Sequence, residues 1–148
     1  MSWINKAKEI FRAEKPEHFT DFTHCEECAE HDQTLLQFDI DTIGLEQLGN
    51  PGWDPLCFCS PEGKIYYMPA LIRLSLESIF DVYYLEQLLF HLEYEGFKNT
   101  FYQACSEPQR AFIVQFMAFL IANHAELLEQ NLSVDEIFRV SEIWSGQA

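Results

Sequence analysis

The sequence predicts an all-α protein: a compact single-domain bundle of roughly six or seven helices around one apolar central helix, with at most one short β element. Apolar residues recur at three- and four-residue spacing along most of the chain. Helix-capping residues stand in front of several of these stretches. The 148 residues are 48 % hydrophobic, and no internal repeat or linker interrupts them. Residues 1–148 are therefore expected to form one helical domain with a single core.

The first helix is predicted directly at the start of the chain. Ser2 is a suitable N-cap, and apolar residues at helical spacing follow it for about a dozen residues. Pro16 ends this helix, because proline cannot continue the hydrogen-bond ladder. In the irregular segment that follows, Phe19 and Phe22 are expected to insert into the core.

Two further helices are predicted before the middle of the chain. Thr23 with Glu26 three residues later matches the capping-box pattern, and the helix that it begins runs to about Gln37. Asp41 or Thr42 then caps a short helix.

The middle of the chain contains the one candidate for extended structure. Turn-forming residues occupy positions 50–55, and Leu56–Cys59 follows them as a short apolar stretch. Ser60 and Pro61 have the cap and first-position chemistry of a new helix. Pro69 is expected to break or kink that helix, with a new helix directly after it.

Three helices are predicted in the second half of the chain. The first covers residues 79–94 and ends at Gly96. The longest covers residues 107–130, with Ser106 as its cap and Gln109 three residues later. Its middle is apolar on nearly every face, as is typical of a central, surrounded helix. A capping box that begins at Ser133 starts the last helix, to about Trp144.

The charge of the chain constrains its partners. The formal net charge is −15, from 24 acidic and 9 basic residues, and four of the basic residues lie in the first fifteen positions. The remainder repels phosphate backbones, which argues against nucleic-acid binding. It attracts a basic protein partner, although an acidic surface also serves solubility alone.

The cellular setting follows from the cysteines and the apolar runs. The five cysteines are an odd number, which leaves one thiol outside any full set of disulfides. The start of the chain lacks the pattern of a secretion signal. The longest apolar run, residues 111–122, is too short to span a bilayer. We therefore expect a cytoplasmic protein with reduced thiols and no membrane partner, whose oligomeric state the sequence leaves open.

Four motifs in the chain resemble a known family. They are His24-Cys25-Glu26-Glu27-Cys28-Ala29-Glu30-His31, Ser60-Pro61-Glu62-Gly63, Tyr66-Tyr67-Met68-Pro69-Ala70 and Pro108-Gln109-Arg110. Together they resemble a family of small bacterial proteins classed as a domain of unknown function. The resemblance covers residues 22 to 123 approximately and implies a bacterial, cytosolic setting without an assigned activity. Cys57 and Cys59 do not belong to that pattern.

The first motif has three interpretations. As a zinc site it would use four Cys or His ligands, from the set Cys25, Cys28, Cys57, Cys59, His24 and His31. As a redox site it would use Cys25 as the attacking thiolate and Cys28 as the resolving thiol. The surrounding carboxylates oppose thiolate formation, and no βαβ pattern of the thioredoxin kind is nearby. The third interpretation is structural: a capped helix start with two small buried residues and an acidic outer face.

A second candidate site consists of aromatic residues. Trp53, Tyr66 and Tyr67 could line a binding pocket, or they could serve core and rim packing. No phosphate loop, nucleophile elbow or HExxH motif is present, so the sequence favours a protein without catalysis.

The function predicted from these features is an acidic cytosolic binding protein. It would recognise a basic protein partner, in the manner of an immunity protein that inhibits a bacterial toxin. The alternative is a small zinc protein, structural or catalytic, centred on Cys25 and Cys28, and a thiol-redox protein is the third hypothesis. No cofactor is expected under the first hypothesis, and zinc is the cofactor of the second.

Overall fold

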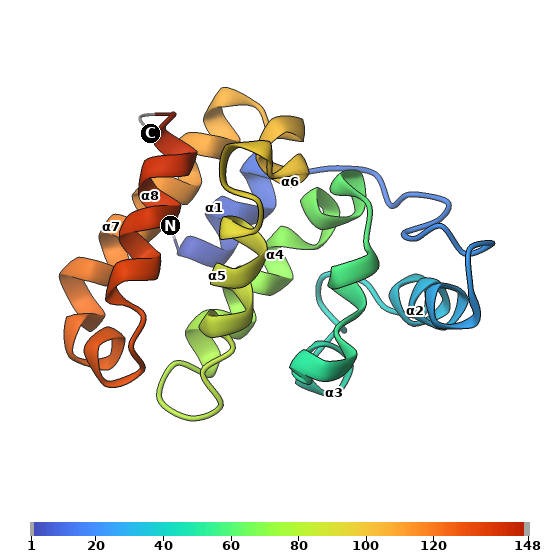
Figure 1. Cartoon of the computed structure of the whole chain (residues 1–148), viewed down its shortest axis with the longest axis horizontal. Helices are drawn as coiled ribbons and strands as arrows, with labels where there is room; N and C mark the ends of the chain where they lie inside the picture. The colour runs from blue at the N-terminus through green and yellow to red at the C-terminus, as the bar shows by residue number, and fades with distance from the viewer. Residues whose placement is uncertain (1, 147–148) are drawn as a thin grey trace. The chain divides into compact units, whose positions relative to one another are not determined.

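The computed structural model describes residues 2–146, and this part of the chain is all-α, as predicted (Figure 1). It contains eight α-helices and three short 3-10 helices, and no strand occurs among the described residues. The chain divides into two compact units, with the boundary between Leu74 and Ser75, inside helix α4 (Pro61–Glu77). The prediction of one domain stays a prediction.

Helix α1 (Trp3–Ile10) begins as predicted and ends earlier. The Ser2 hydroxyl accepts a hydrogen bond from the backbone N–H of Asn5 at 3.1 Å, which satisfies one of the free donors of the first turn. The helix closes at Phe11, whose N–H donates to the carbonyl of Ala7, so Pro16 is not what ends it. Ala7 and Phe11 are fully buried.

Helix α2 (Glu26–Gln37) has Cys25 as its N-cap, whereas the sequence predicted Thr23. The Thr23 hydroxyl donates to the carboxylate of Asp21, so it is not available for the helix start. Cys25 has extended backbone angles, and its Sγ accepts a hydrogen bond from the N–H of Cys28 at 3.3 Å. The helix therefore begins two residues later than predicted, with a thiol in the capping position.

The carbonyl end of α2 is held by two side chains from elsewhere in the first unit. Lys15 Nζ donates to the carbonyls of Leu36 and Phe38 at 2.7 and 2.8 Å. The Tyr67 hydroxyl donates to the carbonyls of Leu35 and Phe38. These donors satisfy the last carbonyls of the helix, which have no partner within it.

The segment predicted as extended is helical. The 3-10 helices η1 (Pro51–Trp53) and η2 (Pro55–Phe58) occupy this region, so the expected β element over Leu56–Cys59 is wrong. The Asp54 carboxylate accepts a hydrogen bond from the N–H of Leu56 at 3.0 Å. An aspartate cap followed by proline favours a helical turn, and that local chemistry outweighs the apolar character of the stretch.

Helix α4 continues through Pro69, where a break was predicted. Met68 and Ala70 on either side of the proline are fully buried, and this packing outweighs the one missing hydrogen bond. Near its start, α4 passes so close to its neighbours that Gly63 has no room for a side chain. A Cβ there would lie 2.5 Å from Cys59 Sγ and 2.7 Å from the Phe19 ring. The short helix α3 (Leu45–Leu48) has Gly44, not Asp41 or Thr42, at its N-cap.

In the second unit, α5 (Leu85–Glu93) is shorter than the predicted helix of residues 79–94. Tyr83 has φ = 58°, which a continuous helix cannot accommodate. The N–H of Tyr84 donates to the Ser78 hydroxyl at 2.9 Å and stabilises the turn that precedes the helix. The short helices η3 (Gly96–Lys98) and α6 (Thr100–Ala104) follow.

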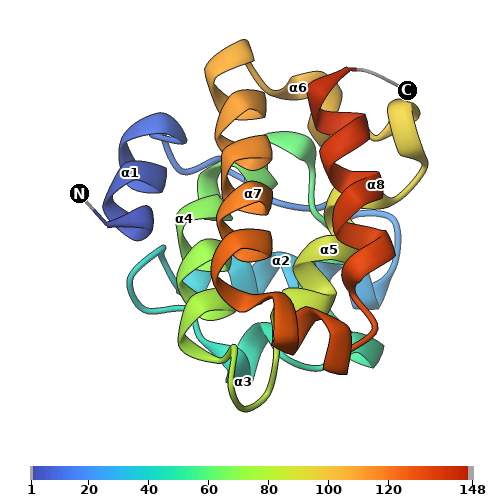
Figure 2. The ribbon, with the colours of Figure 1, turned by 90° about the vertical axis from the view of Figure 1, so that its left-hand side faces the viewer.

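The two C-terminal helices, α7 (Glu107–Gln130) and α8 (Val134–Ser145), lie side by side and antiparallel (Figure 2). Ser106 and Gln109 form the predicted capping box at the start of α7. Ser133 makes no side-chain cap for α8, because its hydroxyl accepts a hydrogen bond from Tyr83 instead. Trp144 Nε1 on α8 donates to the carbonyl of Leu92 on α5 at 2.9 Å.

The apolar helix α7 is buried along one stripe. The fully buried side chains of its apolar middle are Phe112, Ile113, Phe116, Met117 and Leu120. Of the described helices, α7 alone is long and apolar enough to cross a membrane by length and composition, with 33 % of that window buried. A core helix of a soluble protein meets the same criterion. The absence of a membrane partner therefore stays a prediction.

Candidate functional site

Three of the six predicted metal-ligating residues lie together at the start of α2. The ligand atoms of His24, Cys25 and Cys28 are all within 4.8 Å of one another. The Sγ atoms of Cys25 and Cys28 are 3.1 Å apart, and His24 Nδ1 is 3.7 Å from Cys28 Sγ. Cys25 and His24 are exposed, whereas Cys28 is buried behind them. The Cys25 thiol is therefore accessible to a reactant from solvent, and the buried Cys28 thiol lies beside it.

The helix start brings the two thiols together. Cys25 is the N-cap and Cys28 is the third helical residue, so their side chains meet on the same side of the first turn. The free N–H groups and the positive end of the helix dipole at this position stabilise negative charge on a sulfur. The N–H of Cys28, which donates to Cys25 Sγ, is one of these groups.

A buried carboxylate on α2 holds the segment before the site through hydrogen bonds. Asp32 accepts hydrogen bonds from the N–H groups of Phe19 and Thr20 at 2.6 and 3.1 Å. His18 Nδ1 lies 2.8 Å from the other oxygen of the same carboxylate. The Thr20 hydroxyl donates to the carbonyl of Cys28 at 2.6 Å. These bonds fix the chain that leads into Cys25.

Asp32 remains ionised in this buried position. Burial raises its pKa, but the hydrogen bonds from His18, Phe19 and Thr20 outweigh burial and hold the pKa below its ordinary value. Sequence reasoning counted Asp32 as one more surface acid and missed this role. Its position four residues after Cys28 places it on the same buried face of the helix, which was the available signal.

The pKa values of the two thiols are shifted in opposite directions. Hydrogen bonds from the Cys28 side chain, the Cys28 N–H and the His24 side chain lower the pKa of Cys25 to about 7. The same contact with Cys25, together with burial, raises the pKa of Cys28 to about 11. The contact with the Cys25 sulfur also raises the pKa of His24. At neutral pH about half of the Cys25 side chains are thus thiolate, whereas Cys28 is a thiol.

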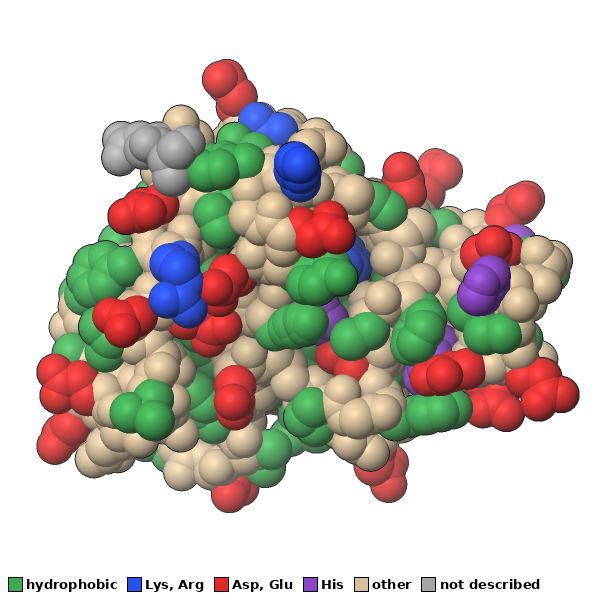
Figure 3. Space-filling view, viewed as in Figure 1, with side chains coloured by type: hydrophobic (Ala, Val, Ile, Leu, Met, Phe, Trp, Pro, Cys, Tyr) green, Lys and Arg blue, Asp and Glu red, His purple; other side chains and the backbone are tan. Residues whose placement is uncertain are grey.

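Carboxylates surround this thiol pair, but the pKa of Cys25 still lies below that of Cys28. Asp21 and Glu27 contribute to the raised pKa of Cys28. Figure 3 shows Asp and Glu side chains over the region of α2 and no Lys or Arg side chain there. From the sequence, these acids were expected to oppose a thiolate at Cys25, but the hydrogen bonds to its sulfur outweigh their charge.

His31 does not join the sulfur pair. Its Nε2 lies 3.3 Å from the Glu27 carboxylate, and its ring packs against Trp53 and Phe58 with centroids 4.6 and 5.0 Å away. The side chain is fully buried, and its Nδ1 has no hydrogen-bond partner in the described part of the chain. His31 therefore belongs to an aromatic stack beside η1 and η2.

Cys57 and Cys59 do not join the sulfur pair either, so the predicted four-cysteine zinc site is not formed. Cys59 is buried against Gly63, and burial raises its pKa to about 12. Cys57 is exposed, and partial burial of its sulfur raises its pKa as well. These two residues lie on and just after η2, where the helical turn replaced the expected strand.

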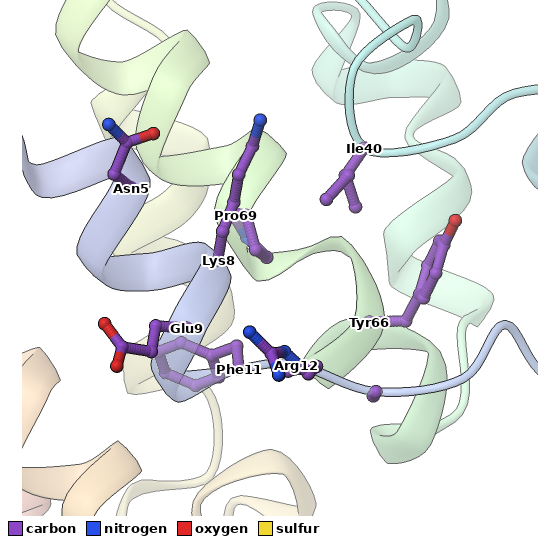
Figure 4. A pocket seen from close by; sticks show the side chains of 9 residues that line it. Asn5, Lys8, Glu9, Phe11, Arg12, Ile40, Tyr66 and Pro69 are labelled. Atoms are coloured by element: carbon purple, nitrogen blue, oxygen red, sulfur yellow. The ribbon is translucent and has the colours of Figure 1, made fainter.

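The aromatic residues that were predicted to bind a ligand are separated. Tyr66 lines a cavity of about 430 Å³ between α1 and α4, together with Lys8, Arg12 and Ile40 (Figure 4). Tyr67 is fully buried, and its hydroxyl is used on α2 carbonyls. Trp53 packs on His31 and does not line that cavity. The three residues therefore do not form one pocket.

Comparison of the chain with protein-family models, with curated proteins and with solved structures finds no match. The resemblance of the motifs to a bacterial family therefore stays a prediction. The functional assignment rests on the chemistry of the thiol pair and its surroundings.

Proposed function

We propose that the protein is a thiol–disulfide oxidoreductase whose reactive dithiol is Cys25 and Cys28. The observation that supports this most directly is the exposed Cys25 sulfur at the N-cap of α2, 3.1 Å from the buried Cys28 sulfur. An attacking thiol is most effective when its pKa lies near the ambient pH, and the pKa of Cys25 is about 7.

The proposed reaction has two exchange steps. The Cys25 thiolate attacks one sulfur of a substrate disulfide; a protein–substrate S–S bond forms, and the other substrate sulfur leaves as a thiolate that takes up a proton. Cys28, after losing its proton, then attacks Cys25 Sγ and releases the second substrate sulfur. The protein dithiol is oxidised to a disulfide, and the substrate disulfide is reduced to two thiols. Two electrons and two protons are transferred, and a low-molecular-weight dithiol restores the reduced protein.

His24 has a role in the second step. Cys28 has a pKa of about 11, so its thiol must be deprotonated before it can attack the mixed disulfide. His24 Nδ1, 3.7 Å from Cys28 Sγ, is in a position to accept that proton. The contact of Cys28 with the Cys25 thiolate disappears once Cys25 is bonded to substrate, which also makes Cys28 easier to deprotonate.

Alkylation and redox titration test this proposal. The reduced protein is treated with iodoacetamide across a pH series, and the five cysteines are quantified by peptide mass spectrometry. Cys25 should react fastest, with a rate that rises through a midpoint near pH 7. Titration with mixtures of reduced and oxidised dithiothreitol should yield one disulfide, between Cys25 and Cys28.

The matched control is Cys57→Ser, because Cys57 is the other exposed cysteine. This variant should keep the fast alkylation and form the same disulfide, whereas Cys25→Ser should lose both. Equal alkylation rates at Cys25 and Cys57, or no disulfide even in a large excess of oxidised dithiothreitol, would overturn the proposal.

A second candidate function is metal binding, because the ligand atoms of His24, Cys25 and Cys28 converge within 4.8 Å. Three protein ligands with a fourth open position are typical of catalytic zinc. The thiol spacing favours the redox proposal, because tetrahedral zinc with Zn–S bonds of about 2.3 Å holds two sulfurs about 3.8 Å apart. Metal analysis of protein purified without chelators separates the two. About one zinc per chain, with Cys25 protected from alkylation, would favour the metal.

A further inference from the structure

We infer that the dithiol acts on disulfides carried by positively charged proteins or peptides. This inference rests on the proposed thiol–disulfide exchange and adds the charge of its substrate. The basic protein partner expected from the net charge would then bind at the exposed Cys25, at the start of α2.

The charged residues of the segment that carries the dithiol are all Asp or Glu, apart from its histidines. Residues 16–63 contain eleven Asp and Glu residues and no Lys or Arg. The cationic residues of the first unit lie on either side of this segment, and two of them already serve other groups. Lys8 pairs with Asp41 at 2.8 Å, and Lys15 donates to the end of α2. No fixed positive charge in this segment compensates the carboxylates near Cys25.

The charges of nearby carboxylates act on two of the three reacting side chains, His24 and Cys28. Asp21 raises the pKa values of both His24 and Cys28, and Glu27 raises that of Cys28. Glu26 follows Cys25 in the chain and is exposed. Figure 3 shows Asp and Glu side chains gathered around the α2 end of the face in view, beside histidine side chains. A substrate that approaches Cys25 therefore enters a negative potential.

This potential discriminates between disulfides by their charge. A cationic disulfide is concentrated near Cys25, and its leaving thiolate is stabilised by the neighbouring ammonium or guanidinium group. An anionic disulfide is repelled from the same carboxylates. Both effects act over about one Debye length, roughly 10 Å at 0.1 M salt, so they weaken as salt is added. The exposed Phe22 ring, stacked on His18 at 4.0 Å, offers an apolar contact beside the acidic groups.

A charge series of small disulfides tests the inference. The reduced protein is mixed at pH 7 with cystamine (cationic), 2-hydroxyethyl disulfide (neutral) or dithiodiglycolate (anionic), at low and at high salt. The second-order rate constant for each disulfide is divided by its rate constant with free 2-mercaptoethanol, which removes differences in intrinsic reactivity. We expect the normalised rate constants to fall from cationic to neutral to anionic, by roughly tenfold overall at low salt. High salt should reduce the difference between the normalised rate constants of the cationic and anionic disulfides.

Charge-neutral variants locate the effect. The double variant Glu26→Gln, Glu27→Gln should narrow the range between cystamine and dithiodiglycolate. Glu46→Gln is the matched control, because Glu46 is an exposed glutamate on α3, outside the helix that carries the dithiol. It should leave the range unchanged.

The outcomes separate this inference from the proposed function. Normalised rates that are equal across the series, or fastest for the anion, would overturn the charge preference and leave the oxidoreductase intact. No reaction of Cys25 with any of the three disulfides would overturn the oxidoreductase itself.

Discussion

The carboxyl group of Glu136 on α8 is hydrogen-bonded to that of Glu93 on α5. Arg139 Nε donates to Glu93 at 2.6 Å, and the charge of this guanidinium also acts on Glu136. Burial and the contact with Glu93 raise the pKa of Glu136 to about 7. Burial also acts on Glu93, but the hydrogen bonds from Arg139 and Glu136 outweigh it and lower its pKa. The pair therefore holds a proton in mildly acidic solution.

This shared proton predicts that the second unit becomes less stable as the pH rises. The folded-state pKa of Glu136, about 7, lies above its ordinary value of 4.5, so the folded protein binds more protons between these two pH values. The stabilisation is fully present below pH 4.5 and is lost as the pH passes 7. Glu136→Gln keeps the hydrogen-bond donor at all pH values and should flatten this part of the pH dependence.

Thermal unfolding between pH 4.5 and pH 8 measures this effect. Two other charges, Glu86 and Arg139, act on the pair, and Asp135 acts on Arg139. None of these three residues is changed by the substitution. Glu142→Gln is the control, because Glu142 lies on the exposed side of α8. A Glu136→Gln profile parallel to that of the unmodified chain would refute the shared proton.

Asp32→Asn should destabilise the protein by about 2–4 kcal/mol, because two backbone donors and His18 lose a buried carboxylate. Urea unfolding measures the change. Asp39→Asn, which removes an exposed turn-capping carboxylate, is the comparison and should cost about 1 kcal/mol. A cost for Asp32→Asn no larger than that for Asp39→Asn would contradict the anchoring role.

Gly63→Ala should destabilise the protein by about 1–3 kcal/mol, although alanine is normally the better helix former. The new Cβ would lie 2.5 Å from Cys59 Sγ and 2.7 Å from the Phe19 ring, both buried groups. Gly44→Ala is the control, since its Cβ would meet nothing closer than 3.7 Å. If the two variants have the same midpoint in urea, the close approach at Gly63 is wrong.

Cys28→Ala should raise the pKa of Cys25 from about 7 toward the ordinary thiol value. The substitution removes the sulfur contact and keeps the backbone N–H that donates to Cys25 Sγ. The thiolate fraction at pH 7 should fall from about half to a few per cent, and alkylation of Cys25 should slow accordingly. The pH profile of iodoacetamide alkylation tests this, with Cys57→Ala as the control. An unchanged profile would show that Cys28 does not set the reactivity of Cys25.

Local chemistry in the sequence was sufficient for the all-α class and for most helix positions. Ser2 and the Ser106–Gln109 capping box begin α1 and α7 as predicted, because a cap needs only a few neighbouring residues. The pairing of Cys25 with Cys28 was also predictable, since helical geometry alone brings these positions together.

Tertiary contacts decided the rest. Ser133 is a sound capping residue, but its hydroxyl accepts a hydrogen bond from Tyr83, which is fifty residues away in the chain. Pro69 stays within a helix because burial on both sides outweighs the missing hydrogen bond. Competing partners that are distant in the chain, or a turn geometry such as that of Tyr83, leave no trace in local residue patterns.

The thiol site shows the same division. The sequence by itself determined which residues could react: a Cys-x-x-Cys pair with a histidine before it, among acids. Only the tertiary structure decided that Cys57, Cys59 and His31 stay away from this pair. It also decided that Asp32 accepts hydrogen bonds from the segment that precedes Cys25. The physical reason is that thiol reactivity depends on hydrogen bonds and burial within a few ångströms, which the chain sets only once it has folded.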